Sequence, residues 1–196
     1  HGGHRTVIGL LRHLPNILTS LRLVAAPAVA ALLFLGDYRV AFVVFAVAGL
    51  SDAVDGFLAK RFGFSTRFGR ILDPIADKAL MFAAFVMLRI LDEVPLWLVL
   101  FIIGRDALIT LGLFVGVAAQ APIRVQPLIL GKLCAALQVL YVAVHMGALA
   151  FGLPLDAVAP YDAYALALVA LVSTLDYIHI WLKAMRVVWN KRASPS

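Results

Sequence analysis

Six long apolar runs, separated by short polar connections, constrain the fold of this chain more than any other feature. Each run has about the 20 residues that an α-helix needs to cross the hydrocarbon core of a bilayer. With 63% hydrophobic and 14% charged residues among 196, the composition excludes an ordinary soluble domain. The runs cover Ile17–Gly36, Val40–Leu58, Ile71–Leu91, Pro95–Ala119, Leu128–Phe151 and Tyr161–Trp181.

These runs predict an all-α polytopic membrane protein with six transmembrane helices. We expect one membrane domain over residues 1–189 and a disordered polar tail over residues 190–196. The segment Arg5–Leu14 alternates basic and apolar positions at roughly helical spacing, ahead of Pro15. It predicts an amphipathic helix that lies in the membrane interface before the chain enters the bilayer.

The distribution of basic residues orients the predicted helices. The chain has 17 Lys and Arg and a net charge of +6. Placing the N-terminus, the Lys60–Lys78 region, the segment from Arg105 to Lys132 and the C-terminus on one side leaves only Arg39 and Arg89 opposite. Positive residues favour the cytoplasmic side. The basic flanks are typical of topology determinants and anchors for anionic lipid, so no nucleic acid is expected as a partner. The Ala-rich, Arg-rich composition favours a bacterial inner membrane.

Four aspartates occur at the ends of the second and third apolar runs. Asp52 and Asp55 are three residues apart, and Asp73 and Asp77 are four apart. Each pair shares one face of a helix, and carboxylates at membrane depth are rarely without a function. If the two helices are antiparallel neighbours, the acids would repel one another unless cations lay between them. Oxygen-only ligands favour Mg²⁺ or Mn²⁺, whereas Cys134 has no cysteine partner for a zinc site. We therefore expect a divalent-metal site at the cytoplasmic surface.

The residues between the aspartate pairs favour a phosphorylated substrate. Gly56 and Ala59 continue the helix face of the first pair, which predicts a small-residue groove beside the metals. Basic side chains would surround this groove with positive charge. They are Lys60, Arg61, Arg67 and Arg70. Acids that hold metal, a narrow groove and a basic collar are suited to a substrate that contains a pyrophosphate.

The spacing of these residues resembles a known signature. The run is Asp52-x-x-Asp55-Gly56-x-x-Ala59-Lys60, then eight residues, then Gly69-x-x-x-Asp73-x-x-x-Asp77. It is similar to the signature of the CDP-alcohol phosphatidyltransferases, an integral-membrane family with six transmembrane helices. The family usually has arginine at the position of Lys60. Lysine keeps the charge but loses the planar fork of the guanidinium.

The resemblance implies a reaction and a set of roles. A phosphatidyl group would pass from CDP-diacylglycerol to an alcohol, with release of CMP. Asp52, Asp55 and Asp73 would bind two Mg²⁺ or Mn²⁺ ions, and Asp77 would share the metal site and act as general base, so that Asp73 and Asp77 are the catalytic pair. The residues implied for the nucleotide site are Gly56, Ala59, Lys60, Gly69, Asn16 and Thr19. The family also forms homodimers, and we expect one here.

Three further segments bear on the acceptor alcohol. Leu14–Arg22 is similar to the opening of both phosphatidylglycerophosphate synthases and CDP-diacylglycerol-dependent cardiolipin synthases. Ile103–Asp106 and Gly131–Gln138 are closer to the cardiolipin synthases. This resemblance implies that the acceptor is the glycerol hydroxyl of phosphatidylglycerol. The alternative is glycerol 3-phosphate, the acceptor of a phosphatidylglycerophosphate synthase.

Three cations are candidates for binding the acceptor phosphate: Arg105 and Lys132, which are lone cations within apolar runs, and Arg67, one of the basic residues between the aspartate pairs. Alternatively, Arg105 pairs with Asp106, or Arg105 and Lys132 mark helix ends at the interface. Asn16 and Thr19 could instead form hydrogen bonds between helices. Outside the enzyme class, the rivals are a divalent-cation transporter and a scaffold whose acids pair internally. The position of all four acids near one surface speaks against a transporter.

Overall fold

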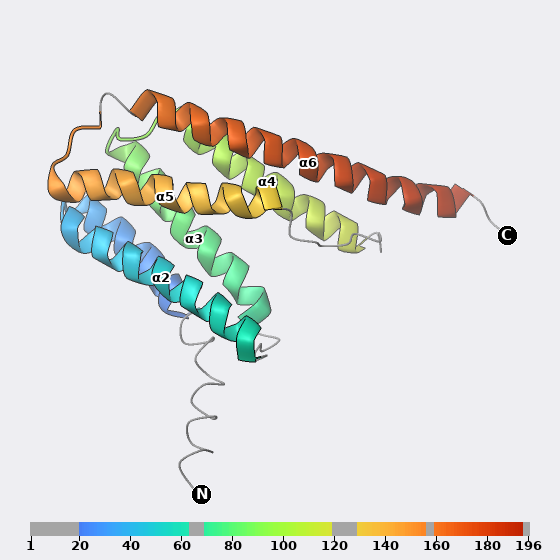
Figure 1. The fold of residues 1–196 in the computed structure, drawn as a ribbon, viewed down its shortest axis with the longest axis horizontal. Helices are drawn as coiled ribbons and strands as arrows, with labels where there is room; N and C mark the ends of the chain where they lie inside the picture. The colour runs from blue at the N-terminus through green and yellow to red at the C-terminus, as the bar shows by residue number, and fades with distance from the viewer. Residues whose placement is uncertain (1–19, 63–68, 119–128, 156–158, 194–196) are drawn as a thin grey trace, which may run out of the picture. The chain divides into compact units, whose positions relative to one another are not determined.

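The computed structural model describes residues 20–62, 69–118, 129–155 and 159–193. Within these ranges all regular secondary structure is helical, which confirms the predicted all-α class. A first helix over Ser20–Phe34 precedes the five helices labelled in Figure 1. These are α2 (Tyr38–Phe62), α3 (Gly69–Ile90), α4 (Leu96–Ala118), α5 (Ile129–Phe151) and α6 (Ala159–Ala193). The predicted interfacial helix over Arg5–Leu14 lies outside the described residues.

Among the described residues, three helices are long and apolar enough to cross a membrane. Their spans are Leu96–Gly116, Ile129–Phe151 and Tyr161–Arg186. Two shorter apolar stretches cover Ser20–Phe34 and Tyr38–Ser51. The prediction of six transmembrane helices is therefore confirmed in part. The apolar stretch of α2 ends where its aspartates begin, and α3 carries several charges of its own, although both backbones continue as helices.

The chain separates into two compact units. The first contains His1–Glu93 and Val142–Leu155, and the second contains Val94–Tyr141 and Asp156–Ser196. In the first unit, large side chains such as Phe45, Phe85 and Leu88 are buried among alanines such as Ala41 and Ala84. Small residues let helix backbones approach closely, which is the usual way to pack helices inside a membrane.

Both faces of α2 are apolar, but only one is buried. Ala41, Phe45 and Ala48 are spaced by four and three residues and form the buried face. The opposite face exposes a row of aliphatic side chains: Val40, Val43, Val47 and Leu50. In water such a face would be unfavourable, whereas a surface in contact with lipid is apolar. The α2 helix is thus built for a membrane environment on its outer side.

Helix ends in the first unit are closed by backbone hydrogen bonds. Gly36 has a φ of 83° and ends the first helix, where the N–H of Asp37 donates to the carbonyl of Leu32. Asp92 has the same left-handed conformation after α3, where the N–H of Glu93 donates to the carbonyl of Leu88. Positive φ at the residue after a helix lets these bonds satisfy the last carbonyls. The first helix and α3 therefore stop in the same way.

In the second unit, α4 and α6 run side by side (Figure 1). Small residues on α6, among them Ala163, Ala170 and Ser173, are buried at helical spacing. A Cβ atom added to Gly112 of α4 would lie 3.1 Å from Oη of Tyr177. Gly112 therefore permits a close contact inside this chain, between α4 and α6.

The last helix extends further than the sequence predicted. The apolar run ended at Trp181 and the polar tail was expected from residue 190, yet α6 has 35 residues and ends at Ala193. Lys191 and Arg192 suit a helix C-terminus because cations interact favourably with the last carbonyls. Asn190 to Ala193 are therefore helical, and residues 194–196 lie outside the described range.

Candidate functional site

The structure places both halves of the aspartate motif on continuous helices of the first unit. Asp52 and Asp55 lie in the second half of α2, together with Gly56, Ala59 and Lys60. Gly69 is the first residue of α3, and Asp73 and Asp77 are its fifth and ninth residues. The helical spacing assumed from the sequence is therefore present in the backbone of both segments.

The register of α2 relates its aspartates to the buried face. Ala41, Phe45 and Ala48 define that face, in steps of four and three residues. The same alternation leads to positions 52, 55 and 59. These positions continue, toward the C-terminal end of α2, the row that is buried nearer its N-terminal end.

The aspartates of α3 also continue a buried row, which here begins near the C-terminal end of the helix. Leu88, Ala84 and Leu80 are buried, in steps of four residues. The next steps of three and four residues lead to positions 77 and 73. In both helices the aspartates thus follow the row of positions that faces the core.

The helix geometry suits a pair of divalent ions. With a rise of about 1.5 Å per residue, the two α2 aspartates are separated by about 4.5 Å along the axis and the two on α3 by about 6 Å. Metal pairs in phosphoryl-transfer sites are about 3.5–4 Å apart. Four carboxylates supply only hard oxygen donors, the type that Mg²⁺ and Mn²⁺ prefer. The donor set therefore fits a two-metal site.

Three other predicted residues, Asn16, Thr19 and Arg67, lie outside the described residues. Their neighbour Arg22 is described and belongs to the first helix. Its side chain is only 2% exposed. A buried arginine in an apolar helix is costly unless it has a structural or functional partner, so the family-like opening Leu14–Arg22 includes at least one inward-facing charge.

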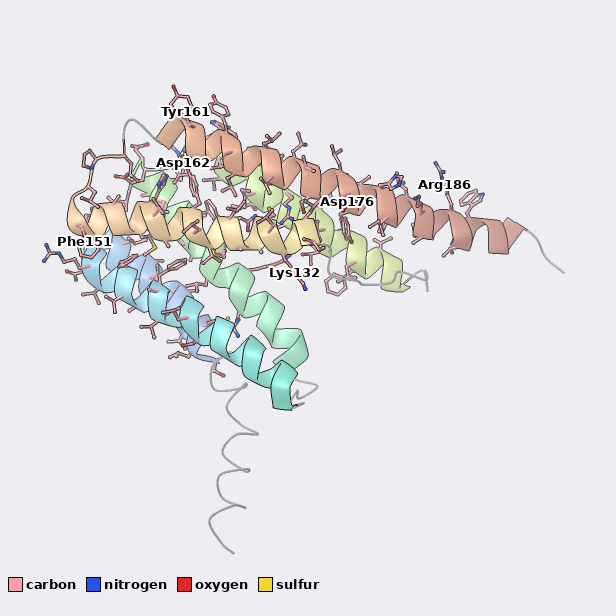
Figure 2. All side chains as sticks on the ribbon, viewed as in Figure 1. Lys132, Phe151, Tyr161, Asp162, Asp176 and Arg186 are labelled. Atoms are coloured by element: carbon pink, nitrogen blue, oxygen red, sulfur yellow. The ribbon has the colours of Figure 1, made fainter. Side chains whose placement is uncertain are left out.

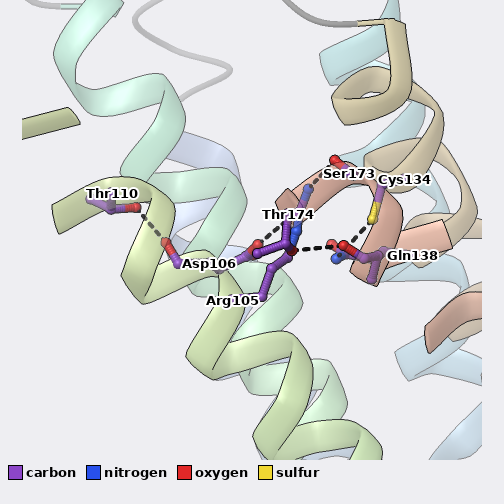
Figure 3. Close-up of polar contacts among 8 residues, drawn as sticks. Arg105, Asp106, Thr110, Cys134, Gln138, Ser173 and Thr174 are labelled. Atoms are coloured by element: carbon purple, nitrogen blue, oxygen red, sulfur yellow. Dashed lines mark hydrogen bonds and ion pairs between the residues drawn. The ribbon is translucent and has the colours of Figure 1, made fainter. Parts of the chain in front are cut away.

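Arg105 lies in a polar cluster in the middle of α4. Its side chain is 8% exposed, and its Nη1 donates to Oδ1 of Asp106 at 2.7 Å. Its Nη2 donates to Oγ of Ser173 on α6 at 3.0 Å (Figure 3). Nε is buried without a hydrogen-bond acceptor among the described residues. The ion pair with Asp106, one of the alternatives raised by the sequence, is therefore formed.

Arg105 lies where the sequence predicted it, inside an apolar run. It is near the centre of the apolar span Leu96–Gly116. The helix tolerates it there because Asp106 and Ser173 use two of its five donors. Lys132 lies instead on the first turn of α5 and is exposed (Figure 2).

The cluster extends to α5 through residues that the sequence did not connect to it. Cys134 is fully buried, and Nε2 of Gln138 lies 3.8 Å from its Sγ (Figure 3). Ser173 was also not predicted as a site residue, because a single serine in an apolar helix has no feature that distinguishes it from other serines. Its spacing from Leu166 and Ala170, both buried, was the available signal. These residues form a buried polar centre in the second unit.

Comparison with known sequences identifies the family. The profile of CDP-alcohol phosphatidyltransferase matches residues 12–189. This chain belongs to the CDP-alcohol phosphatidyltransferase family. The match includes both aspartate pairs and the polar cluster around Arg105, so the family relationship extends over both units.

The relatives within the family are named as two kinds of synthase. A probable phosphatidylglycerophosphate synthase of Mycobacterium tuberculosis is 40% identical over 106 residues, which are 51% of this chain and 51% of the relative. A cardiolipin synthase (CMP-forming) of Rattus norvegicus is 28% identical over 194 residues, covering 91% of this chain and 64% of the relative. This chain thus spans between about half and just under two thirds of the length of these relatives. Both acceptor classes named from the sequence occur among them.

Proposed function

We propose that this protein transfers the phosphatidyl group of CDP-diacylglycerol to the glycerol hydroxyl of phosphatidylglycerol, giving cardiolipin and CMP. Family membership over residues 12–189 supports the reaction class. The observation that carries the proposal is the register of the two aspartate pairs, which continue the buried rows of α2 and α3. Four acids in those rows need cations from outside the chain.

The aspartates Asp52, Asp55, Asp73 and Asp77 would hold two Mg²⁺ or Mn²⁺ ions. When bound, such a pair offsets the negative charge that develops on the diphosphate as CMP leaves. Asp77 would accept the proton of the acceptor hydroxyl, a step that typically contributes about 10²–10⁴-fold to the rate. Asp73, on the preceding turn of α3, would support it in this role.

The remaining motif residues would bind the nucleotide. Gly56, Ala59 and Gly69 leave room for the ligand to approach the helix backbone, and Lys60 would neutralise a phosphate as a point charge. Asn16 and Thr19 are proposed at the same site by resemblance to the family. The polar groups of this site would face the cytoplasm in a bacterial inner membrane, and the protein would act as a homodimer.

Binding of the acceptor phosphate is proposed for Arg105, Lys132 and Arg67. The unsatisfied Nε of Arg105 supports its role, because a buried N–H without an acceptor favours an anionic ligand. The segments around Arg105 and Lys132 resemble cardiolipin synthases, which favours phosphatidylglycerol. Glycerol 3-phosphate is the alternative, supported by the 40% identity to the Mycobacterium tuberculosis relative.

The test is a reconstitution of the purified full chain in lipid nanodiscs. CDP-diacylglycerol and Mn²⁺ are supplied with either phosphatidylglycerol or glycerol 3-phosphate, and products are identified by mass spectrometry. We expect cardiolipin and CMP from phosphatidylglycerol. Phosphatidylglycerophosphate as the main product would overturn the acceptor assignment. Absence of metal-dependent CMP release with every alcohol would overturn the transferase assignment. Metal-ion flux into sealed proteoliposomes in its place would indicate a transporter.

A further inference from the structure

A hollow in the second unit lies between α4 and α6, and its lining residues are distinct from those of the polar cluster. Its volume is about 450 Å³. It is lined by aliphatic side chains of both helices, which we call its walls, and by Gly112, Tyr177 and Trp181, which we call its floor. This volume falls within the range of about 300–1,000 Å³ that is typical of small-molecule sites. We call it the α4–α6 groove.

The floor of the groove is apolar because its polar atoms are already bonded. Oη of Tyr177 donates to the carbonyl of Ile109 at 3.0 Å. Nε1 of Trp181 donates to the carbonyl of Gly112 at 2.8 Å. These bonds hold both rings against α4, where Gly112 has no side chain to displace them. The floor therefore presents aromatic carbon atoms to a ligand.

The walls of the groove are open to the surroundings. Leu111 of α4 is 65% exposed and Leu182 of α6 is 46% exposed. Both residues belong to the apolar spans Leu96–Gly116 and Tyr161–Arg186. In a bilayer, the molecules in contact with such spans are acyl chains.

A cation lies at one end of the groove. Arg186 follows Leu182 by four residues, so it lies one turn further along the same side of α6, and it is exposed (Figure 2). It is also the last residue of the apolar span. Tyr177 to Leu182 lie four to nine residues earlier, which is about 6–14 Å deeper. Trp189, which is 77% exposed, lies one turn beyond Arg186, where an aromatic ring suits the interface.

We propose that the α4–α6 groove binds one phospholipid with an anionic headgroup. An acyl chain lies on the floor of Gly112, Tyr177 and Trp181, and the headgroup phosphate lies at Arg186. Charge complementarity favours a phospholipid over a second copy of the chain. Copies in one membrane keep the same depth, so a symmetric contact through this face would bring two Arg186 side chains to the same level. The site is independent of the proposed reaction.

The test measures lipid binding to the purified full chain in detergent by native mass spectrometry. Phosphatidylglycerol and phosphatidylcholine are titrated separately. Arg186→Gln should weaken phosphatidylglycerol about fivefold, the effect of one basic residue near anionic lipid, and leave phosphatidylcholine unchanged. Leu111→Trp, at an exposed wall, should fill the groove and weaken both lipids by a similar factor or more.

The matched control is Lys183→Gln. It removes the same charge from an exposed position of α6, but Lys183 directly follows Leu182 and so lies about 100° around the helix from it. We expect binding of both lipids within about twofold of the unchanged protein. Equal weakening by Arg186→Gln and Lys183→Gln would overturn the proposal. Unchanged lipid binding in Leu111→Trp, or dissociation of a dimer in that variant, would also overturn it.

Discussion

The two units carry charge within apolar helices in opposite ways. On α2 and α3, four like charges follow the buried rows of two helices. On α4, Arg105 and Asp106 are opposite charges in direct contact, and Ser173 of α6 accepts a further hydrogen bond from the guanidinium. The second arrangement balances its charges within the protein, although Nε of Arg105 has no acceptor among the described residues. In the proposed assignment the first would take its positive charge from bound metal ions, and this difference would separate a candidate catalytic site from a buried ion pair.

The largest expected effect separates activity from stability in the first unit. Asp77→Asn should lower the rate of CMP release by about 10²–10⁴-fold, because it removes the proposed general base. In the absence of metal its melting temperature should stay the same or rise, since one of four like charges is gone. Activity and thermal unfolding in detergent measure the two effects. Asp37→Asn, at an exposed position before α2, is the control and should change neither.

The opposite response is expected in the second unit. Arg105→Leu leaves Asp106 without its cation and should lower the free energy of unfolding by about 3 kcal/mol. The double variant Arg105→Leu/Asp106→Leu should recover most of this loss, because no net charge remains buried. Thermal unfolding of the two variants measures the difference. A double variant no more stable than the single one would contradict the ion-pair interpretation.

A smaller effect tests the bond between α4 and α6. Ser173→Ala should destabilise the protein by about 1 kcal/mol, because one donor of a buried guanidinium loses its acceptor. Thr174→Val is the matched control. The hydroxyl of Thr174 bonds Ala170 of its own helix at 2.7 Å, so its removal should have less effect. Equal shifts in melting temperature for the two variants would show that the hydrogen bond between Ser173 and Arg105 adds no stability.

The smallest effect compares glycines in the two units. Gly147→Ala places a Cβ 3.4 Å from Cε2 of Phe42, an ordinary contact, so the better helix propensity should stabilise by about 0.5–1 kcal/mol. Gly112→Ala meets Tyr177 at 3.1 Å, and the hydrogen bond to Ile109 prevents that ring from moving away. The Gly112→Ala substitution should therefore lower the free energy of unfolding. Melting temperatures that shift in the same direction would contradict this comparison.

Much of the fold could be predicted from the sequence because its signals are local. The apolar runs located the helices, and the three- and four-residue spacings of the aspartates matched the helical backbone of α2 and α3. The inward face of α2 could not be predicted, since Val43 and Val47 on its exposed side are as apolar as Phe45 on its buried side. In a membrane protein, hydrophobic periodicity does not distinguish lipid from core.

The residues that form the polar cluster could not be predicted from the sequence for a different reason. Arg105 was assigned to the cytoplasmic side because basic residues favour that side, and its polar partners were left open. Its burial depends on Ser173, which lies 68 positions away and has no distinguishing neighbour in the chain. The roles of the aspartates as metal ligands stay a prediction, as does the nucleotide site.

The length of α6 has a practical consequence. From Tyr161 to Ala193 the helix contains no proline, the residue most often responsible for a sharp bend. At about 1.5 Å per residue, its 35 residues extend well past the hydrocarbon core. A helical protein fused in frame at Ala193 would continue the same axis, which would provide a rigid fiducial for aligning this 21.2 kDa chain in cryo-electron microscopy images.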